Sequence, residues 1–418
     1  MKTFNVPFVY RSPLITAIKA QRRAADKLKK DLSPTVLDFG PVKFLLARHF
    51  GFCYGVENAI EIAYRCVEEN QGKRIFLLSE MIHNPQVNAD LQEKGIRFLQ
   101  DTHGKQLIPF ESLNPDDVVI IPAFGTTMAM EAKLISLGIQ PEKYNTTCPF
   151  VEKVWNRGEA LGDKGYSLVI HGKPKHEETR ATFSRSAAHS AAVVINDMEE
   201  AVVLGDIITG KKSREDFFTR FTGRYSEGFN PEVHLKKFGV INQTTQLASD
   251  TQAIADYLKS VLLSVPGLSE DAFAETRDTL CYATNDNQTA VQGMLENKAD
   301  LAVVVGGYNS SNTSHLVELC EENLPTYFIN GPEKIISEKE IEHFNWRTKE
   351  ILTTKGFLPA KTPVTIMITS GASCPDALVE QVMERLIECF PEAKSMEEIR
   401  ESLGEGLIPN GFLPSQSL

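Results

Sequence analysis

Three of the seven cysteines stand at similar places in the sequence, each shortly before a predicted helix. Cys53 follows a predicted strand and precedes an amphipathic segment, and Cys148 directly precedes Pro149, a residue suited to the first position of a helix. Cys281 precedes a helix that we expect over Gln288–Leu295. A helix N-terminus has unpaired N–H groups and the positive end of the helix dipole, which lowers the pKa of a thiol and favours the metal-binding thiolate. If these three sites converge, they predict a thiolate-bound metal centre.

The other cysteines show the alternative for any one of these positions. Cys66, Cys320 and Cys389 each lie inside an amphipathic helical pattern, where a cysteine behaves as a small buried hydrophobe. The sequence contains no C-x₂-C pair, the usual sign of a zinc or iron–sulfur site. An odd number of scattered cysteines does not resemble a disulfide framework, so we expect reduced thiols.

Two polar loops, each after a predicted strand, could hold an anion. The segment GGYNSSNTSH places Ser310, Ser311 and Asn312 at the start of a helix, and TSGASCPD places Ser373 just before Pro375. Hydroxyls, amides and the N–H groups of a helix N-terminus suit phosphate oxygens. Helix capping is the alternative for either loop alone, but the two together favour a phosphate site.

A third polar segment, HGKPKHEETRAT, combines groups that could exchange protons. It contains His171, His176 and Glu178 beside two lysines in an otherwise acidic chain. A histidine–carboxylate cluster after a strand suits acid–base catalysis, with a solvated loop as the alternative. His83, in the segment HNPQV, is either a further anion ligand or simply a residue at the start of a helix.

Short β-branched runs alternate with amphipathic helical stretches along the chain, which predicts an α/β fold with parallel sheets. In such sheets ligands bind at the carboxyl ends of the strands, where the polar loops fall. Polar insertions are expected at Asp206–Glu232 and Gly331–Lys361. The expected strands are Val42–Arg48, Ile75–Leu78, Val118–Pro122, Tyr166–His171, Ala192–Ile195, Phe238–Asn242, Leu301–Gly306, Thr326–Ile329 and Val364–Thr369.

Composition excludes several classes of protein. The length of 418 residues suggests about three domains, and 42% hydrophobic with 24% charged residues is ordinary for a globular chain. A net charge of −11 argues against nucleic-acid binding. Without a long apolar stretch or an apolar leader region, we expect no membrane span and a cytoplasmic protein. Plastid import through residues 1–40 stays open.

Eight short motifs, in this order, resemble the 4-hydroxy-3-methylbut-2-enyl diphosphate reductase family, also called LytB or IspH. They are GFCYGV, HNPQV, TCP followed by V-x-K-V-W, H-x-E-x-x-x-T, NQTT, CYAT, NSSN and TSGAS-x-PD, and they fall within Val42–Glu388. Each motif is weak alone, but eight in order are very specific. The segments PAFGTT and IHGKPKHEET resemble the branch found in cyanobacteria and plant plastids.

The resemblance implies a fold, a cofactor and a reaction. The implied fold is a three-lobed trefoil of small parallel-sheet α/β domains around a central [4Fe-4S] cluster. The implied reaction reductively removes the allylic hydroxyl of (E)-4-hydroxy-3-methylbut-2-enyl diphosphate, which binds the open iron of the cluster, and gives isopentenyl and dimethylallyl diphosphates. This is the last step of the non-mevalonate isoprenoid pathway. We expect an N-terminal extension at 1–41, lobes at 42–150, 151–280 and 281–388, and a C-terminal tail at 389–418.

The matching motifs also imply roles for individual residues. The implied cluster ligands are Cys53, Cys148 and Cys281. Glu178 is the implied proton donor, and Thr244 in NQTT is the hydroxyl that helps to relay the proton. The implied ligands of the allylic diphosphate are His83, His176, Ser310, Ser311, Asn312 and Ser373. The implied partner is an electron donor such as ferredoxin or flavodoxin.

The sequence departs from the bacterial form of the family at Phe124, where A-F-G stands in place of the usual A-H-G. One expected diphosphate-binding histidine is therefore missing, and His171 or a nearby lysine could compensate. Cys374, next to the phosphate loop, is expected to be a packing residue. Two rival functions stay open: an iron–sulfur dehydratase acting on another substrate, and a non-enzymatic metal or redox sensor. The sensor would need neither Glu178 nor the anion-binding loops.

Overall fold

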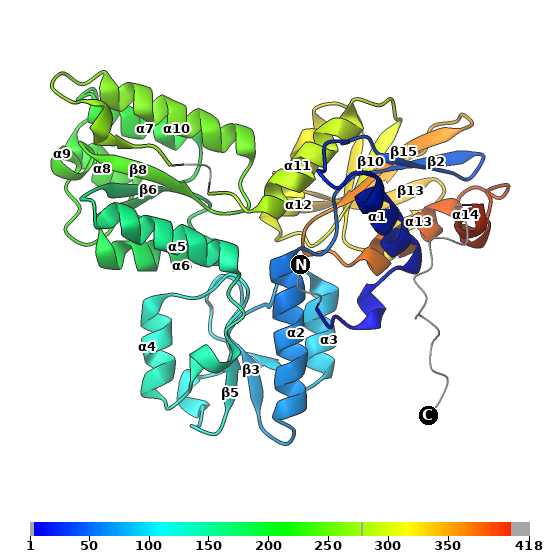
Figure 1. Ribbon diagram of the computed structural model, residues 1–418, viewed down its shortest axis with the longest axis horizontal. Helices are drawn as coiled ribbons and strands as arrows, with labels where there is room; N and C mark the ends of the chain where they lie inside the picture. Colours follow the sequence, from blue (N-terminus) through cyan, green and yellow to red (C-terminus); the bar gives the residue numbers. More distant parts are fainter. Residues whose placement is uncertain (1–3, 277–278, 403–418) are drawn as a thin grey trace. The chain divides into compact units, whose positions relative to one another are not determined.

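The computed structural model describes residues 4–276 and 279–402, and the chain divides into two compact units (Figure 1). The first unit comprises Tyr54–Asn285 together with Phe4. The second unit combines Asn5–Cys53 with residues 286–402. Each unit encloses hydrophobic core residues of its own.

The N-terminal part of the first unit contains a small parallel sheet in the order β4-β3-β5. Its strands are β3 (Ile75–Leu77), β4 (Arg97–Phe98) and β5 (Val118–Ile120), and its helices are α2 (Tyr54–Glu69), α3 (Pro85–Glu93) and α4 (Met128–Ser136). Asn84 caps α3 by accepting a hydrogen bond from the backbone N–H of Val87, and Pro85 takes the first helical position. The loop after β3 therefore carries His83 to the start of α3.

A second parallel sheet completes the first unit, in the order β7-β6-β8-β9. Its strands are β6 (Ser167–His171), β7 (Ala192–Ile195), β8 (Phe238–Asn242) and β9 (Phe273–Ala274). Helices α5 (Pro149–Gly162) and α6 (Glu177–His189) cover one face, whereas α7 (Met198–Ile208) and α10 (Ala248–Leu263) cover the other (Figure 1). Successive strand residues serve opposite faces: Leu168 packs in the core beside α5, and Val169 packs in the core beside α7 and α10.

The insertion expected at Asp206–Glu232 folds onto this second sheet. It forms α8 (Arg214–Arg220) and leads into α9 (Pro231–His234). Phe217 is fully buried in the same core as Val169, and its ring stacks on Phe229 with the centroids 5.0 Å apart. Phe217 and Phe229 of this segment thus belong to the core of the second sheet.

The second unit is built on a five-stranded sheet in the order β1-β2-β15-β10-β11, in which only β1 and β2 pair antiparallel. Its strands are β1 (Thr35–Asp38), β2 (Val42–Leu46), β10 (Leu301–Val305), β11 (Thr326–Ile329) and β15 (Val364–Ser370). Its helices are α1 (Pro13–Ala25), α12 (Ser311–Glu321), α13 (Asp376–Ile387) and α14 (Met396–Ser402). Helix α11 (Tyr282–Leu295) begins in the first unit and ends in the second. The parallel pairing places the carboxyl ends of β10 and β15 side by side.

The sequence located the strands well, and the expected α/β class with parallel sheets is confirmed. Every expected strand forms, with ends within two residues of the prediction. The segment Gly331–Lys361 forms an antiparallel sheet of β12 (Ile335–Ser337), β13 (Glu340–Asn345) and β14 (Glu350–Lys355). Of the tail expected at 389–418, the residues from 403 onwards lie outside the described part of the chain.

The grouping of strands differs from the expected division. Strand β2 was expected to open the lobe at 42–150, but it hydrogen-bonds β15 in the second unit. Of the expected extension at 1–41, residues 5–41 also belong to this unit, and Leu14, Ile15 and Ile18 are buried in its core. A sequence pattern shows that a segment is a strand, but not which distant strand it pairs with.

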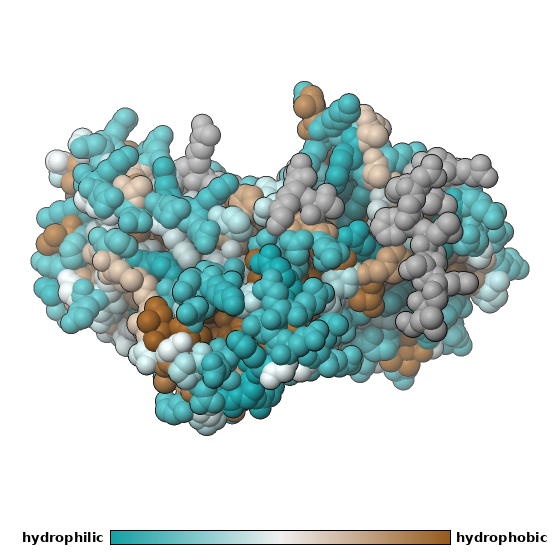
Figure 2. All heavy atoms as spheres, turned by 60° about the horizontal axis from the view of Figure 1, so that its bottom comes forward, coloured by the Kyte–Doolittle hydropathy of each residue, from teal (hydrophilic) through white to brown (hydrophobic). Residues whose placement is uncertain are grey.

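In the described residues, no helix is long and apolar enough to cross a membrane. Figure 2 shows mainly hydrophilic residues on the face that it presents, with hydrophobic residues in small patches.

Candidate functional site

A buried carboxyl at the start of α6 meets the loop that follows β8. Oε1 of Glu178 accepts a hydrogen bond of 2.6 Å from the backbone N–H of Thr244, and Oε2 accepts one of 2.9 Å from the Thr244 hydroxyl. Glu178 is 2% exposed. Burial raises the pKa of Glu178 to about 7, although both bonds from Thr244 act in the opposite direction. The carboxyl therefore holds a proton near neutral pH, as a general acid must.

The same loop binds the segment of Cys281. The backbone N–H of Cys281 donates to the carbonyl of Thr244 at 3.1 Å, and the hydroxyl of Thr284 donates to that carbonyl at 2.9 Å. Helix α11 begins directly after Cys281, so the expected start at Gln288 is wrong. The cysteine sulfur accepts the backbone N–H of Thr284 at 3.3 Å and so caps the helix itself.

Cys148 is the N-cap residue of α5, as expected from Pro149. Its backbone N–H donates to the carbonyl of Ala123 at 2.9 Å. A Cβ atom added at Gly55 would lie 2.5 Å from the Cys148 sulfur, so this glycine leaves the space that the sulfur occupies. The absence of a side chain at Gly55, in the first turn of α2, therefore makes room for the sulfur of Cys148.

The prediction that the helix N-termini lower the pKa of the cysteine thiols is wrong for Cys148 and Cys281 in the protein without a bound metal. Burial raises the pKa of Cys148 to about 12, and burial also raises the pKa of the Cys281 thiol. For these two partly buried thiols the loss of hydration outweighs the helix N-terminus, whose field acts on a thiolate only over the first turn. A thiolate at either position needs an additional positive charge, which a bound metal supplies.

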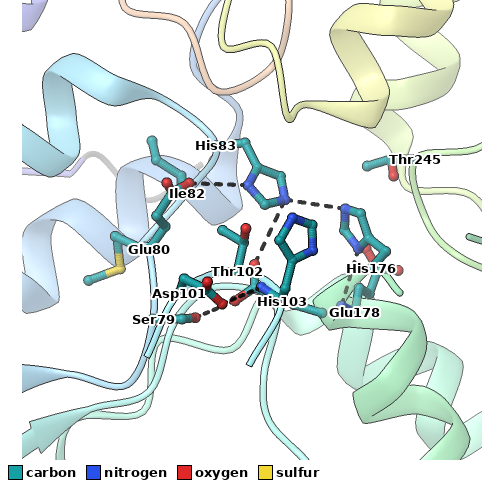
Figure 3. Close-up of polar contacts among 12 residues, drawn as sticks. Ser79, Glu80, Ile82, His83, Asp101, Thr102, His103, His176, Glu178 and Thr245 are labelled. Atoms are coloured by element: carbon teal, nitrogen blue, oxygen red, sulfur yellow. Dashed lines mark hydrogen bonds and ion pairs between the residues drawn. The ribbon is translucent and has the colours of Figure 1, made fainter. Parts of the chain in front are cut away.

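Two histidines of the first unit face each other across 3.3 Å, measured between their Nε2 atoms (Figure 3). His83 lies in the loop before α3, and His176 is the N-cap residue of α6. Phe124 stacks on His83 with the ring centroids 4.2 Å apart, and it meets the ring of His176 edge-on at 5.6 Å. The residue that replaces the expected histidine thus supports the two histidines of the site.

Carboxylates surround His83 on two sides. Oε2 of Glu80 lies 3.5 Å from its Nδ1, and Oε2 of Glu177 lies 3.9 Å from its Nε2. Burial raises the pKa of Glu177 to about 7. Glu177 was not among the residues expected from the sequence, where its only signal is its position between the two motif residues His176 and Glu178.

The two anion loops of the second unit come together beside Cys53. Asn312 Oδ1 accepts the backbone N–H of Ala372 at 2.9 Å, and the carbonyl of Ala372 accepts the backbone N–H of Cys53 at 3.1 Å. Ser310 caps α12 by accepting a hydrogen bond from the backbone N–H of Thr313. Asn312 Nδ2 is buried and has no hydrogen-bond partner among the described residues, which leaves a donor for an anion.

Ser311 and Ser373 are the other hydroxyl residues expected in these loops, and both are buried. The loops themselves approach closely, since a Cβ atom at Gly371 would lie 1.9 Å from the Thr313 hydroxyl. All four residues expected to bind phosphate in this unit therefore belong to one buried polar cluster with Cys53 at its edge.

The remaining candidates have structural surroundings. His171 ends β6, and its Nδ1 lies 3.3 Å from Asn242 Oδ1. Cys374 is fully buried in the core of the second unit, which confirms it as a packing residue. Cys66 and Cys320 are also fully buried, and burial raises the pKa of each thiol to about 12.

The fold and site define an α/β protein that gathers an acid, two thiols and a histidine pair at the ends of parallel strands, an arrangement typical of enzymes. The chain belongs to the LytB family, because the family model described as LytB protein matches residues 44–387.

Relatives of known name are similar over most of the chain. The 4-hydroxy-3-methylbut-2-enyl diphosphate reductase of Synechococcus sp. strain WH7803 is 40% identical over 360 residues, which is 85% of this chain and 88% of the relative. The protein of the same name from Gloeobacter violaceus is 37% identical over 385 residues, which is 90% of this chain and 88% of the relative.

Solved structures share the fold. A structure of (E)-4-hydroxy-3-methyl-but-2-enyl diphosphate reductase, titled the terminal enzyme of the non-mevalonate pathway, matches with a TM-score of 0.51 and 25% identity, over 82% of this chain and 99% of that chain. The structure of the Plasmodium falciparum reductase matches with a TM-score of 0.60 over 84% of this chain and 89% of that chain, and at 21% identity it supports the fold alone.

Proposed function

We propose that this chain reduces (E)-4-hydroxy-3-methylbut-2-enyl diphosphate to isopentenyl and dimethylallyl diphosphates, the last step of the non-mevalonate pathway. The observation that carries the proposal is the buried carboxyl of Glu178, fixed by the loop that also binds Cys281. The reaction consumes two electrons and two protons and releases water. The hydroxyl leaves as water only if it is protonated, and Glu178 is the acid that supplies this proton.

The thiols of the chain fit an iron–sulfur cluster as donors. Cys148 and Cys281 both stand at helix N-termini of the first unit, and Gly55 leaves room for the sulfur of Cys148. In the described residues, no three His, Cys, Asp or Glu side chains are grouped closely enough to hold a metal. We therefore propose Cys53 as the third ligand from its motif GFCYGV and not from its position. A bound [4Fe-4S] cluster would supply electrons and one Lewis-acidic iron with an open position.

The other residues bind and orient the substrate. We assign the diphosphate to hydrogen-bond donors that are mostly buried, since a water-poor site strengthens each bond to the phosphate oxygens. These donors are His83, His176, Ser310, Ser311, Asn312 and Ser373. Thr244 holds Glu178 in place and adds its hydroxyl next to the proton to be transferred. The electrons come from a low-potential carrier protein such as ferredoxin or flavodoxin.

Anaerobic reconstitution, iron and sulfide counting, and turnover of the allylic diphosphate with a reduced dye test this function in one sample. We expect about four irons per chain, as in Cys-ligated [4Fe-4S] proteins, together with formation of both products. Cys148→Ala and Cys281→Ala should lose iron and turnover, whereas the matched variants Cys66→Ala and Cys320→Ala should keep both. A full cluster without turnover would instead favour a dehydratase of another substrate or a sensor.

A further inference from the structure

Glu177 is a second buried carboxyl beside the histidine pair, and the function proposed above does not use it. The Ser79 hydroxyl donates to its Oε1. Its Oε2, 3.9 Å from His83 Nε2, is buried and has no hydrogen-bond partner among the described residues. A buried carboxylate with one oxygen left unpaired is costly, so Glu177 is stable there mainly in its protonated form.

The hydrogen bonds around His176 fix the protons of the histidine pair. The backbone N–H of Glu178 donates to Nδ1 of His176 at 3.2 Å, and burial holds the pKa of His176 well below its usual value. The neutral ring therefore carries its proton on Nε2, which donates to Nε2 of His83 across 3.3 Å. In this state Nε2 of His83 is an acceptor and bears no proton.

A phosphate oxygen that separates the two rings changes what His83 must do. His176 turns its N–H to the oxygen, but Nε2 of His83 would then present a lone pair to an anion. To bind the oxygen, His83 must gain a proton on Nε2. A carboxyl oxygen, Oε2 of Glu177, lies 3.9 Å from that nitrogen.

We propose that Glu177 stores the proton that His83 needs when a diphosphate binds. This inference rests on the proposed function only in that the site binds a diphosphate. In the transfer, the O–H bond of Glu177 breaks and an N–H bond forms at Nε2 of His83, which leaves a carboxylate beside an imidazolium. The two atoms must approach by about 1 Å to reach hydrogen-bond distance. The cation so formed takes the place of the positive charge that a histidine at position 124 would offer.

The charged groups around the pair agree with this role. Glu80 faces the other nitrogen of His83 and stabilises the imidazolium. Arg180 lowers the pKa of Glu177 and so stabilises the carboxylate after transfer. Lys173 and Arg180 both lower the pKa of His176, which keeps the second ring neutral.

Glu177 also has a route by which it can recover its proton. It lines a cavity of about 160 Å³ together with Ser79, Gln100, Thr126 and Arg180. A cavity of this size with several polar groups holds water. After the product leaves, the N–H bond at Nε2 of His83 breaks and the proton returns to Glu177, and water in the cavity keeps this carboxyl in exchange with solvent protons.

Calorimetric titration of the reconstituted holoenzyme with inorganic pyrophosphate, in buffers of different ionisation enthalpy, counts the protons taken up on binding. At pH 6, wild type supplies the proton from Glu177, whereas Glu177→Gln must take it from solvent, so the variant should take up about one proton more. At pH 8 Glu177 has already lost its proton and the difference should vanish. Gln at this position keeps the shape and the acceptor for Ser79. As a matched control, Glu131→Gln removes another carboxyl whose pKa burial raises, and its count should equal that of wild type.

Equal proton counts for wild type and Glu177→Gln at pH 6 would overturn the inference while leaving the proposed function intact. Absence of pyrophosphate binding by wild type would overturn both. A measurement on wild type alone covers the case of a poorly folded variant: pyrophosphate at pH 6 should remove one protonated-carboxyl C=O band from the infrared difference spectrum. Retention of that band would contradict the transfer.

Discussion

The carboxyl of Glu178 is held at both oxygens by a single residue, Thr244, through its backbone N–H and its hydroxyl. The carbonyl of the same threonine accepts the backbone N–H of Cys281. One residue therefore sets the orientation of the acid and the position of a proposed cluster ligand. A movement of Thr244 would therefore displace both the Glu178 carboxyl and the backbone of Cys281.

Glu178→Gln should lower turnover by about 10²- to 10⁴-fold, the usual contribution of a general acid. The amide keeps the size of the side chain but cannot donate a proton to the leaving hydroxyl. The iron content should stay at the wild-type level, because the variant leaves every cysteine in place. Turnover close to that of wild type would contradict the role of Glu178 as acid.

Thr244→Val should move the alkaline limb of the rate–pH profile upwards. The hydroxyl bond lowers the pKa of Glu178, so its loss raises that pKa, by up to about one unit for one hydrogen bond. The acid works when protonated, so its activity is present below the pKa and is lost as the pH rises through it. With a higher pKa, activity persists to higher pH.

Thr244→Ser is the matched control for this shift, because serine keeps the hydroxyl. Its profile should coincide with that of wild type in position. The measurement is kcat/KM over pH 6 to 9 for both variants. Equal profiles for Thr244→Val and wild type would exclude a bond from this hydroxyl to the working acid.

Gly55→Ala should lower the iron content while leaving the chain folded. A Cβ atom there would lie 2.5 Å from the sulfur of Cys148 and must displace it. Alanine favours a helix over glycine by about 1 kcal/mol, so helix propensity does not oppose folding. Iron counting and thermal unfolding give the two readouts.

Asn58→Ala, on the same helix α2, is the control for this substitution. This substitution raises helix propensity by a similar amount without adding an atom at Gly55, so the iron content should stay unchanged. A Gly55→Ala protein with full iron content would show that the sulfur does not need this space.

Phe124→Leu should raise KM for the diphosphate about three- to tenfold. The stacked ring that supports His83 is lost, and such a pair contributes about 0.5–1.5 kcal/mol. Phe124→Tyr keeps the ring and should stay near wild type. Steady-state kinetics of the three proteins gives the comparison, and equal KM values would remove Phe124 from the binding of substrate.

Ile15→Ala should destabilise the second unit by about 2–5 kcal/mol, the usual range for a buried isoleucine. Ile15 is fully buried in the core that also contains strand β2, so its side chain leaves a cavity. Val9→Ala, at a position that is 58% exposed, should cost less than 0.5 kcal/mol. Denaturant unfolding distinguishes the two, and a small effect at Ile15 would show that the N-terminal segment is peripheral.

The sequence by itself determined the strands, the α/β class and the family. Strands are short β-branched runs, and their periodicity depends only on neighbouring residues, which a sequence displays. Cys148 could be placed as a helix cap because Pro149 follows it. The start of α11 could not, because the sulfur of Cys281 replaced the expected cap through a contact that sequence rules do not include.

Only the tertiary structure decided which residues meet and what their protons do. The pairing of β2 with β15 and the bonds between Glu178 and Thr244 join segments far apart in the chain. The raised pKa values of Glu177 and Cys148 come from burial, which depends on the packing of the whole unit. Residue types set which groups can titrate, but the loss of hydration on folding sets the pH at which they titrate.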